Sequence, residues 1–238
     1  MPPEPPAPPR ERVSIVIPAL DEEHSLPLVL AEIPRGIADR VVVVDNGSTD
    51  KTAEVARAAG ATVVSEPRRG YGSACLAGIA AVPDADVIVF LDADHSDRPE
   101  EMPLLVRPIL DGTADLVLGS RTLGGAEAGA VLPQAAFGNW LSTRLIWLLF
   151  RRRYSDLGPF KAIRASSLRS LGMRDRDYGW NVEMQIRAIK KGLRVVEVPV
   201  SYRRRIGGAS KISGTLRGTI GAGWKMLFTI FRYALTRN

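Results

Sequence analysis

The feature that most constrains the fold is an alternation, over the first 120 residues, of short β-branched runs with segments of helical character. This alternation is typical of a parallel, doubly wound α/β sheet. The predicted strands are Val13–Ile17, Val41–Val44, Thr62–Val64, Val87–Leu91 and Leu116–Leu118. The predicted helices are Glu22–Ile33, Thr52–Ala59, Ser73–Ala80 and Glu100–Leu110. Because ligands bind beyond the carboxyl ends of such strands, the residues after each strand are the first candidates for chemistry.

From Arg121 on, the pattern changes to helices and loops, with one later strand at Arg194–Val200. No Ser/Pro-rich linker separates the two halves, so we predict one domain over residues 12–238. Within it, residues 12–120 form a nucleotide-binding half and residues 121–238 an acceptor-binding half. Residues 1–11 contain six prolines and no apolar segment, which predicts a disordered tail rather than a signal peptide.

Charge is divided unequally between these halves. The chain has 10 basic and 20 acidic residues up to Ser120, but 22 basic and 6 acidic residues from Arg121 on. The formal net charge of +6 therefore hides an acidic half and a basic half, which suggests two electrostatic tasks. A hydrophobic fraction of 45% excludes a largely disordered chain, and the single Cys75 excludes an internal disulfide.

Acidic motifs follow three of the predicted strands: PALDEE, DNGSTD and DADHSD. Their carboxylates should meet at one edge of the sheet, where mutual repulsion requires a counter-charge. A hard divalent cation, Mg²⁺ or Mn²⁺, that shares oxygen ligands with a substrate phosphate would supply it. Asp92 and Asp94 are the predicted metal ligands, because alternate residues after the apolar strand point to one side. Asp97 is predicted to cap the next helix instead.

In this order and spacing, VSIVIPALDEE, VVVVDNGSTD, RRGYGSA, VIVFLDADHSDRPEE and DLVLGSR resemble the family 2 glycosyltransferases, which have the GT-A fold. DLGPFKAIR, GWNVEMQIRAIKKGLRVVEVPVSYRRR and SKISGT resemble the branch that contains dolichyl-phosphate mannose and glucose synthases. The resemblance covers roughly residues 13–233. It implies a GT-A transferase that uses a nucleotide sugar, to which the apolar pattern of this chain adds C-terminal amphipathic helices.

The resemblance implies roles for the residues after the strands. The base and ribose of a UDP- or GDP-sugar would be contacted by Pro18, Leu20, Glu22 and Asp45. Asp92 and its neighbour Ala93 would lie near the ribose and the metal. Asp94 would hold the metal on the diphosphate and is therefore a candidate catalytic residue. Related enzymes often have Gln where this chain has Ser96, so the third metal ligand stays open among Ser96, His95 and water.

Basic residues at three places are predicted to meet phosphates. Arg121 directly follows a strand and is a candidate catalytic residue that binds the diphosphate or the acceptor phosphate. The RRGYGSA turn offers Arg68 and Gly70 to a phosphate, with a plain turn as the alternative. A flexible segment that could close over the diphosphate, or be a solvated loop, is flanked by Arg203, Arg205 and Lys211.

Glu183 and Trp180 lie together on a predicted helix. We predict that Trp180 contacts substrate and that Glu183, at the exposed helix end, is the third catalytic candidate. Its role stays open among a base for a hydroxyl acceptor, a group that positions the sugar or arginines, and a structural pairing. A polyprenyl phosphate is already ionised at pH 7 and would need no base.

Two apolar segments bear on membranes. Near the C-terminus, Trp224, Leu227, Phe228, Phe231 and Leu235 recur at helical spacing, and NWLSTRLIWLLFRRR ends in three arginines. Such helices suit an anionic membrane surface, and packing on the domain or on a second subunit is the alternative. Because no apolar stretch reaches about 18 uncharged residues, we predict a peripheral enzyme at the cytoplasmic face of the membrane, with a homo-oligomer possible.

The sequence thus predicts a metal-dependent, inverting transferase that moves a hexose from a UDP- or GDP-sugar to a polyprenyl (dolichyl-like) phosphate. One alternative is transfer to a hydroxyl of a glycolipid or small metabolite, with Glu183 as base. Another is a non-catalytic module that binds a nucleotide sugar or an anionic lipid. Nucleic acid is not expected as a partner, because the arginines gather around the transferase motifs.

Overall fold

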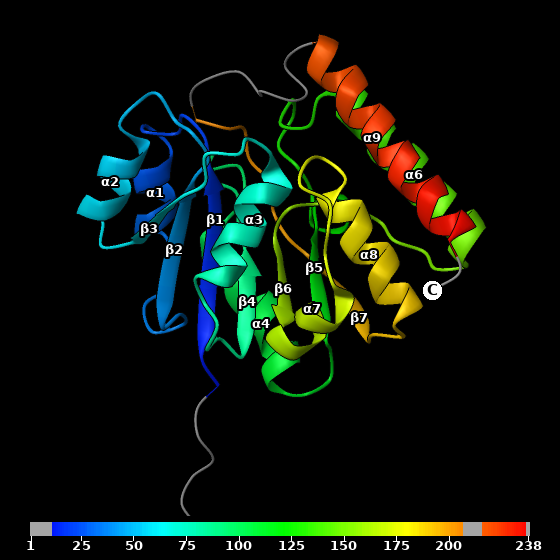
Figure 1. Ribbon diagram of the computed structural model, residues 1–238, viewed down its shortest axis with the longest axis horizontal. Coiled ribbons are helices and arrows are strands. Elements are labelled where there is room, and N and C mark those ends of the chain that lie inside the picture. Colours follow the sequence, from blue (N-terminus) through cyan, green and yellow to red (C-terminus); the bar gives the residue numbers. More distant parts are fainter. Residues whose placement is uncertain (1–10, 207–215, 237–238) are drawn as a thin grey trace, which may run out of the picture.

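The structure is a computed structural model that describes residues 11–206 and 216–236, with helices packed around one sheet (Figure 1). The sheet has seven strands in the order β3-β2-β1-β4-β6-β5-β7. Their bounds are β1 (Val13–Ala19), β2 (Arg40–Asp45), β3 (Thr62–Ser65), β4 (Val87–Phe90), β5 (Leu116–Ser120), β6 (Lys161–Arg164) and β7 (Val195–Pro199). All neighbours pair in parallel except β6, which runs antiparallel between β4 and β5. The predicted doubly wound, mostly parallel α/β fold is confirmed.

Helices cover both faces of the sheet (Figure 1). One face packs against α1 (Leu26–Ala31), α2 (Thr52–Ala58) and α4 (Met102–Leu110), which follows the short 3-10 turn η1 (Pro99–Glu101). The other face packs against α3 (Tyr71–Ala80), α7 (Ala165–Leu171) and α8 (Trp180–Lys190). The remaining helices are α5 (Arg121–Gly124), α6 (Pro133–Phe150) and α9 (Leu216–Leu235). In Figure 1, α6 and α9 lie side by side beyond α8, and both α6 and α8 contact α9.

Strand β1 shows why these residues form a sheet covered on both faces. Ile15 and Ile17 are buried in one hydrophobic cluster, while Val16 between them is buried in the other. Alternate residues of a strand point to opposite faces, so a continuous apolar run is what a doubly covered strand requires. The same burial holds for every residue of β4, which carries the DADHSD motif at its carboxyl end.

Strand β6 is the element that the sequence pattern did not predict. Its four residues, KAIR, have a charged side chain at each end and only one β-branched residue. Nevertheless Lys161 and Ala162 are fully buried, because β6 inserts between β4 and β5. The position is set by tertiary pairing, which local sequence does not reveal.

The predicted tail at residues 1–11 lies outside the described residues except for Glu11. That residue is anchored, since its Oε1 lies 2.6 Å from Nη1 of Arg164. The first helix is also shorter than predicted, because residues 22–25 form turns before α1 begins at Leu26.

Helix α9 buries some of its apolar residues and exposes others. On α9, Ala222 and Ile230 are buried, while Trp224 and Leu235 are 72% and 84% exposed. The apolar stripe predicted from the sequence therefore faces largely outward rather than into the domain. No helix within residues 11–206 and 216–236 is long and apolar enough to cross a membrane.

Candidate active site

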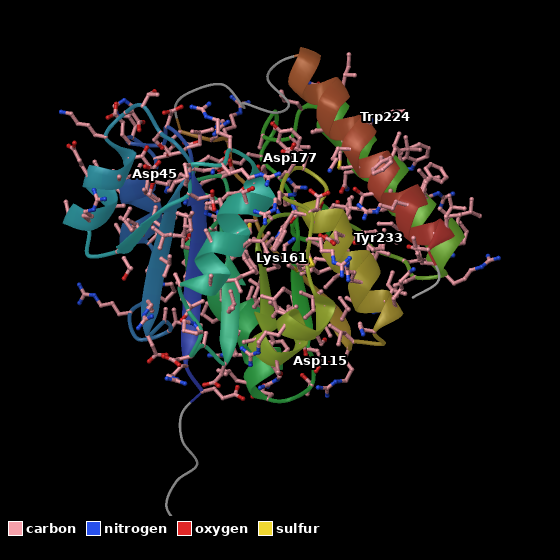
Figure 2. The ribbon with its side chains drawn as sticks, in the orientation of Figure 1. Asp45, Asp115, Lys161, Asp177, Trp224 and Tyr233 are labelled. Carbon is pink, nitrogen blue, oxygen red and sulfur yellow. The ribbon has the colours of Figure 1, made fainter. Side chains whose placement is uncertain are left out.

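The carboxyl ends of β1, β2 and β4 open into one pocket of about 1170 Å³. Figure 2 shows Asp45 and Asp177 at this end of the molecule and Asp115 at the other. Nine of the predicted site residues line the pocket: Pro18, Leu20, Glu22, Gly70, Asp92, Ala93, Asp94, Arg121 and Arg205. Residues far apart in the sequence thus meet at the edge where parallel α/β sheets bind ligands.

Three carboxylates gather after β4. Asp97 is only 1% exposed, and its Oδ1 is buried without a hydrogen-bond partner. Burial, and then the charge of Asp94, raises the pKa of Asp92 to about 7. Burial and both neighbouring carboxylates also raise the pKa of Asp97 well above its ordinary value. The prediction that Asp97 caps a helix is wrong, because Arg98 precedes η1 and makes no side-chain cap.

Two further side chains, those of Tyr71 and Lys161, interact with Asp92 of this cluster. Tyr71, in the glycine-containing turn, donates its hydroxyl hydrogen bond to Oδ1 of Asp92 over 3.1 Å. Lys161 of β6 is fully buried, and its Nζ donates to Oδ1 of Asn181 over 2.6 Å. Burial lowers the pKa of Lys161 to about 8, against the effect of nearby carboxylates that include Asp92. The sequence did not single out Lys161 because β6 itself was not predicted.

Arg205 supplies positive charge to the DADHSD motif. Its Nη2 lies 2.8 Å from Oε1 of Glu22 and 3.4 Å from Oδ2 of Asp94. The backbone before it runs along the motif, since the amide of Arg203 donates to the carbonyl of Ser96 over 2.9 Å. Lys211, predicted to act with Arg205, lies outside the described residues.

Arg203 itself is not among the described residues that line the pocket, so its substrate contact stays a prediction. Its guanidinium pairs with Glu32 and donates from Nε to the carbonyl of His95 over 2.7 Å. The His95 ring is also held by Glu32, at 2.9 Å between Nε2 and Oε1. Arg203 therefore holds the turn that carries Asp94. Only Nε2 of His95 is engaged, since its Nδ1 is buried without a hydrogen-bond partner.

Arg121 lines the pocket but is already paired. Asp156 accepts hydrogen bonds from its Nε over 2.8 Å and from its Nη2 over 2.7 Å. The guanidinium also stacks over the ring of Tyr202, 4.9 Å from the centroid. Such a bidentate pair fixes the orientation of the guanidinium, so its remaining edge is pre-set toward the pocket.

The carboxylates fit a divalent cation that is completed by a ligand. Within the described residues, no group of three His, Cys, Asp or Glu side chains is arranged to bind a metal by itself. The orphaned Oδ1 of Asp97 and the raised pKa of Asp92 nevertheless mark negative charge that lacks a counter-ion. A hard cation held by Asp92 and Asp94 would take its remaining oxygens from water or from donor phosphates.

Glu183 and Trp180 are not in the pocket. Trp180 is 1% exposed and packs edge-on against Phe90 in the core, with ring centroids 6.1 Å apart. This corrects its predicted substrate contact. Glu183 is also 1% exposed, and its carboxylate accepts hydrogen bonds from four partners: the amides of Arg174 and Asp175, Nε of Arg187 and the hydroxyl of Tyr233. Of the three roles left open for Glu183, this geometry favours the structural pairing.

The glycine turn owes its glycines to close packing. A Cβ on Gly70 would lie 2.2 Å from the carbonyl oxygen of Arg176, and φ of Gly70 is 137°. Arg68 in the same turn lines a separate, smaller cleft. Asp45 ends β2 beside the pocket, where its Oδ1 accepts from the amide of Ser48 over 2.9 Å, but its neighbour Asn46 lines the pocket instead.

The far half of the pocket lies between α6 and α9 and is mostly apolar. The two helices approach closely at Gly138, where an added Cβ would lie 3.9 Å from Cε of Met226. The larger apolar lining residues from these helices are Phe137, Leu141, Ile220, Trp224, Met226 and Leu227, and α6 also contributes the polar Gln134, Asn139 and Ser142. One continuous cavity therefore joins the carboxylate edge to an apolar groove.

Comparison with known proteins places this architecture in a family. The model of glycosyl transferase family 2 matches residues 14–172. An uncharacterised glycosyltransferase of Mycobacterium tuberculosis is 44% identical over 221 residues, which cover 91% of this chain and 98% of the relative. An undecaprenyl-phosphate mannosyltransferase of Micrococcus luteus is 33% identical over 220 residues, covering 87% and 90%.

A solved structure agrees with these relatives. Glucosyl-3-phosphoglycerate synthase from Mycobacterium tuberculosis, in complex with Mn²⁺, UDP and glucosyl-3-phosphoglycerate, superposes with a TM-score of 0.78. It is 25% identical, and the match covers 96% of this chain and 81% of that one. The predicted GT-A fold and glycosyltransferase class are confirmed, and the chain belongs to glycosyl transferase family 2.

Proposed function

We propose that this enzyme transfers a hexose from a UDP- or GDP-sugar to a polyprenyl phosphate, with a divalent cation bound at Asp92 and Asp94. The observation that carries the proposal is the single cavity with a carboxylate end and an apolar end. The nucleotide sugar would bind at the carboxylate end. The phosphate of the acceptor would lie where the two ends meet, and its isoprenoid chain would lie in the apolar groove. The similarity to the undecaprenyl-phosphate mannosyltransferase of Micrococcus luteus supports this acceptor class.

The donor would lie across the carboxyl ends of β1 and β4. Pro18, Leu20 and Glu22 line the part of the pocket proposed for the base and ribose. The diphosphate would lie near Asp94, between the guanidinium groups of Arg121 and Arg205. When bound, the cation would supply Lewis-acid neutralisation of the leaving nucleoside diphosphate. Arg121 is pre-oriented by Asp156, so it can stabilise the same charge without reorganising.

The reaction is a single displacement at the anomeric carbon. An acceptor phosphate oxygen forms the new bond to this carbon as the bond to the diphosphate oxygen breaks, and the electron pair leaves with the nucleoside diphosphate. Attack opposite the leaving group inverts the configuration. An ionised phosphate has no proton to lose, so this chemistry needs no general base. Transfer to a hydroxyl with Glu183 as base is disfavoured, because four donors already engage that carboxylate.

The acceptor also suggests where the enzyme works. Trp224 and Leu235 on α9, and Phe137 and Trp140 on α6, are all more than half exposed. On α6 the guanidinium of Arg144 lies over the ring of Trp147, 5.1 Å from the centroid. Exposed aromatic and cationic side chains on paired helices suit the interface of an anionic membrane. We propose that α6 and α9 contact the cytoplasmic membrane surface, from which the lipid chain would enter the groove.

A transfer assay tests the proposed reaction. Purified enzyme would be given UDP- or GDP-hexoses with Mg²⁺ or Mn²⁺ and a short-chain polyprenyl phosphate, with the matching polyprenol as control acceptor. We expect a glycosylated lipid from the phosphate only, with inverted anomeric configuration by NMR. Product formed from the polyprenol as fast as from the phosphate would overturn the acceptor assignment. Absence of donor turnover with every nucleotide sugar would overturn the transferase proposal itself.

A further inference from the structure

A second, smaller cleft of about 200 Å³ lies between α8, α9 and the segment 174–176. Its lining is dominated by cations: Arg68, Arg174, Arg176, Lys225 and Arg232. Among the described residues, the acidic side chains in its lining are Asp175 and Glu183. This volume lies below the range of small-molecule pockets, so the cleft is too small for a nucleotide sugar but suits a single anionic group.

The charges in this cleft are unbalanced. Both acids are already neutralised, Asp175 by Lys225 at 3.1 Å and Glu183 by Arg187 at 2.9 Å. In the part of the chain that the structure describes, the guanidinium groups of four lining residues have no carboxylate within ion-pair distance: Arg68, Arg174, Arg176 and Arg232. Like charges gathered on one concave surface repel each other unless an anion joins them. Guanidinium groups favour phosphate among anions, because their paired N–H donors match its oxygens.

The cleft borders the exposed apolar stripe of α9. Lys225 and Arg232 directly follow Trp224 and Phe231, two members of that stripe. Figure 2 shows Trp224 on the outer side of α9 and Tyr233, which lines the cleft, on the side toward α8. A ligand with a phosphate in the cleft could therefore place attached hydrocarbon against the stripe, as a phospholipid does at a membrane surface.

We propose that this cationic cleft is a second anion site that binds a phosphate group, supplied by the headgroup of an anionic phospholipid. The proposal rests on the membrane contact inferred above for α9. The site is separate from the donor pocket, because none of the described residues lines both. Its function would be to hold α9 at an anionic bilayer, so that the groove between α6 and α9 faces the lipid phase.

The test compares two triple variants that lose the same charge. The cleft variant is Arg174→Gln/Arg176→Gln/Arg232→Gln, and the control is Arg35→Gln/Arg107→Gln/Arg169→Gln, whose arginines are equally exposed and line neither pocket. One arm measures co-sedimentation with phosphatidylglycerol/phosphatidylcholine vesicles. The other measures thermal stabilisation by sodium phosphate against sodium chloride at equal ionic strength. Circular dichroism checks folding, and the single variants Arg232→Gln and Arg169→Gln replace any triple variant that fails to fold.

We expect the cleft variant to bind the anionic vesicles at least about tenfold more weakly than the control, since each basic residue near a membrane surface contributes measurably. We also expect it to lose phosphate stabilisation that the control keeps. If only the phosphate effect is lost, the cleft binds a soluble phosphate and the lipid source is wrong. Equal behaviour of the two triple variants in both arms overturns the site. Neither arm measures transfer, so these outcomes are independent of the proposed reaction.

Discussion

Aspartates lie at both ends of the sheet, but their pKa values are shifted in opposite directions. At the amino end, Asp115 pairs with Arg194 at 2.7 Å, and this hydrogen bonding lowers the pKa of Asp115. At the carboxyl end, burial raises the pKa of Asp92 and of Asp97, and an oxygen of Asp97 has no partner. Figure 2 shows Asp115 at the far end from Asp45 and Asp177.

The difference separates carboxylates that fix the fold from carboxylates held for a ligand. Pairing at the amino end ties strands together: Asp115 before β5 meets Arg194 before the neighbouring β7, and Glu11 before β1 meets Arg164 of β6, two strands away. At the carboxyl end the protein keeps buried negative charge close together, although this arrangement lowers stability. Perturbed carboxylates in a cleft are typical of functional sites, because binding a counter-charge there recovers the lost free energy.

The largest effect should come from removing one charge at the carboxyl end. We expect Asp94→Asn to lower kcat/KM for hexose transfer by roughly 10²–10³-fold or more, because a preorganised charge at the leaving group is lost. The same chemical change at the other end, Asp115→Asn, should leave kcat/KM within about twofold, since that pair is remote from the pocket. Steady-state kinetics with Mn²⁺ measure both. If Asp94→Asn were as active as the wild type, the carboxylates at the carboxyl end would not serve catalysis.

The next effect concerns the turn that carries Tyr71 to the carboxyl end. A Cβ on Gly72 would lie 2.2 Å from the carbonyl oxygen of Asp175, and both groups belong to backbone that is fixed by packing. We expect Gly72→Ala to lower the free energy of unfolding by about 1–3 kcal/mol, because the turn must move. It should also raise KM for the donor, since Tyr71 would lose its position at Asp92.

The matched control for this change is Gly221→Ala on α9, where an added Cβ meets nothing within 4 Å. In a helix this substitution should stabilise the protein by up to about 1 kcal/mol. Urea unfolding measures both variants. If Gly72→Ala were as stable as Gly221→Ala, the close packing of the glycine turn would not matter for the site.

How much of this site the sequence could predict depended on whether the signal was local. Asp92 and Asp94 were predicted because both follow one apolar strand, and the fold-level pattern was strong over residues 13–120. Asp97 was misassigned because a residue before Arg-Pro reads locally as a helix cap. Its actual neighbour is Tyr202, whose backbone bridges to it from more than 100 residues away.

The remaining features that the sequence did not reveal have the same cause. Arg121 lines the pocket, but its pairing with Asp156, 35 residues later, has no signature in spacing. Glu183 was predicted at an exposed helix end, and it is buried because Tyr233 of α9 and the segment at Arg174 cover it. Lys161 was missed together with β6, whose burial depends on two partner strands. Long-range packing decides such positions, and local patterns do not encode it.

A third prediction concerns stability without metal. Because the pKa of Asp92 is raised to about 7, the folded chain holds this proton more tightly than the unfolded chain between about pH 4 and pH 7. Wild-type stability should therefore fall as pH rises through that window. Asp92→Asn removes the charge, so at about pH 8 it should be more stable by on the order of 1–2 kcal/mol, while losing transfer activity.

Urea unfolding in EDTA at about pH 5 and pH 8 checks this prediction, with the gain of Asp92→Asn expected to be larger at the higher pH. Adding Mn²⁺ should stabilise the wild type more than the variant, since only the wild type keeps both proposed ligands. If Asp92→Asn were less stable than the wild type at pH 8, the charge of Asp92 would not destabilise the folded protein.

The smallest effect should come from the amino end, where the pKa of the aspartate is lowered rather than raised. The pKa of Asp115 is lowered by its hydrogen bonds with Arg194, so its contribution to stability is present above the unfolded pKa and is lost as pH falls through the folded one. Because the Arg194 side chain is 55% exposed, solvent screens this pair and its contribution to stability should be small. We expect Asp115→Asn and Arg194→Gln to destabilise by similar amounts near neutral pH. Unfolding at about pH 2 should abolish the difference between the wild type and Asp115→Asn, and a penalty that persists there would show that packing, not charge, holds this end of the sheet together.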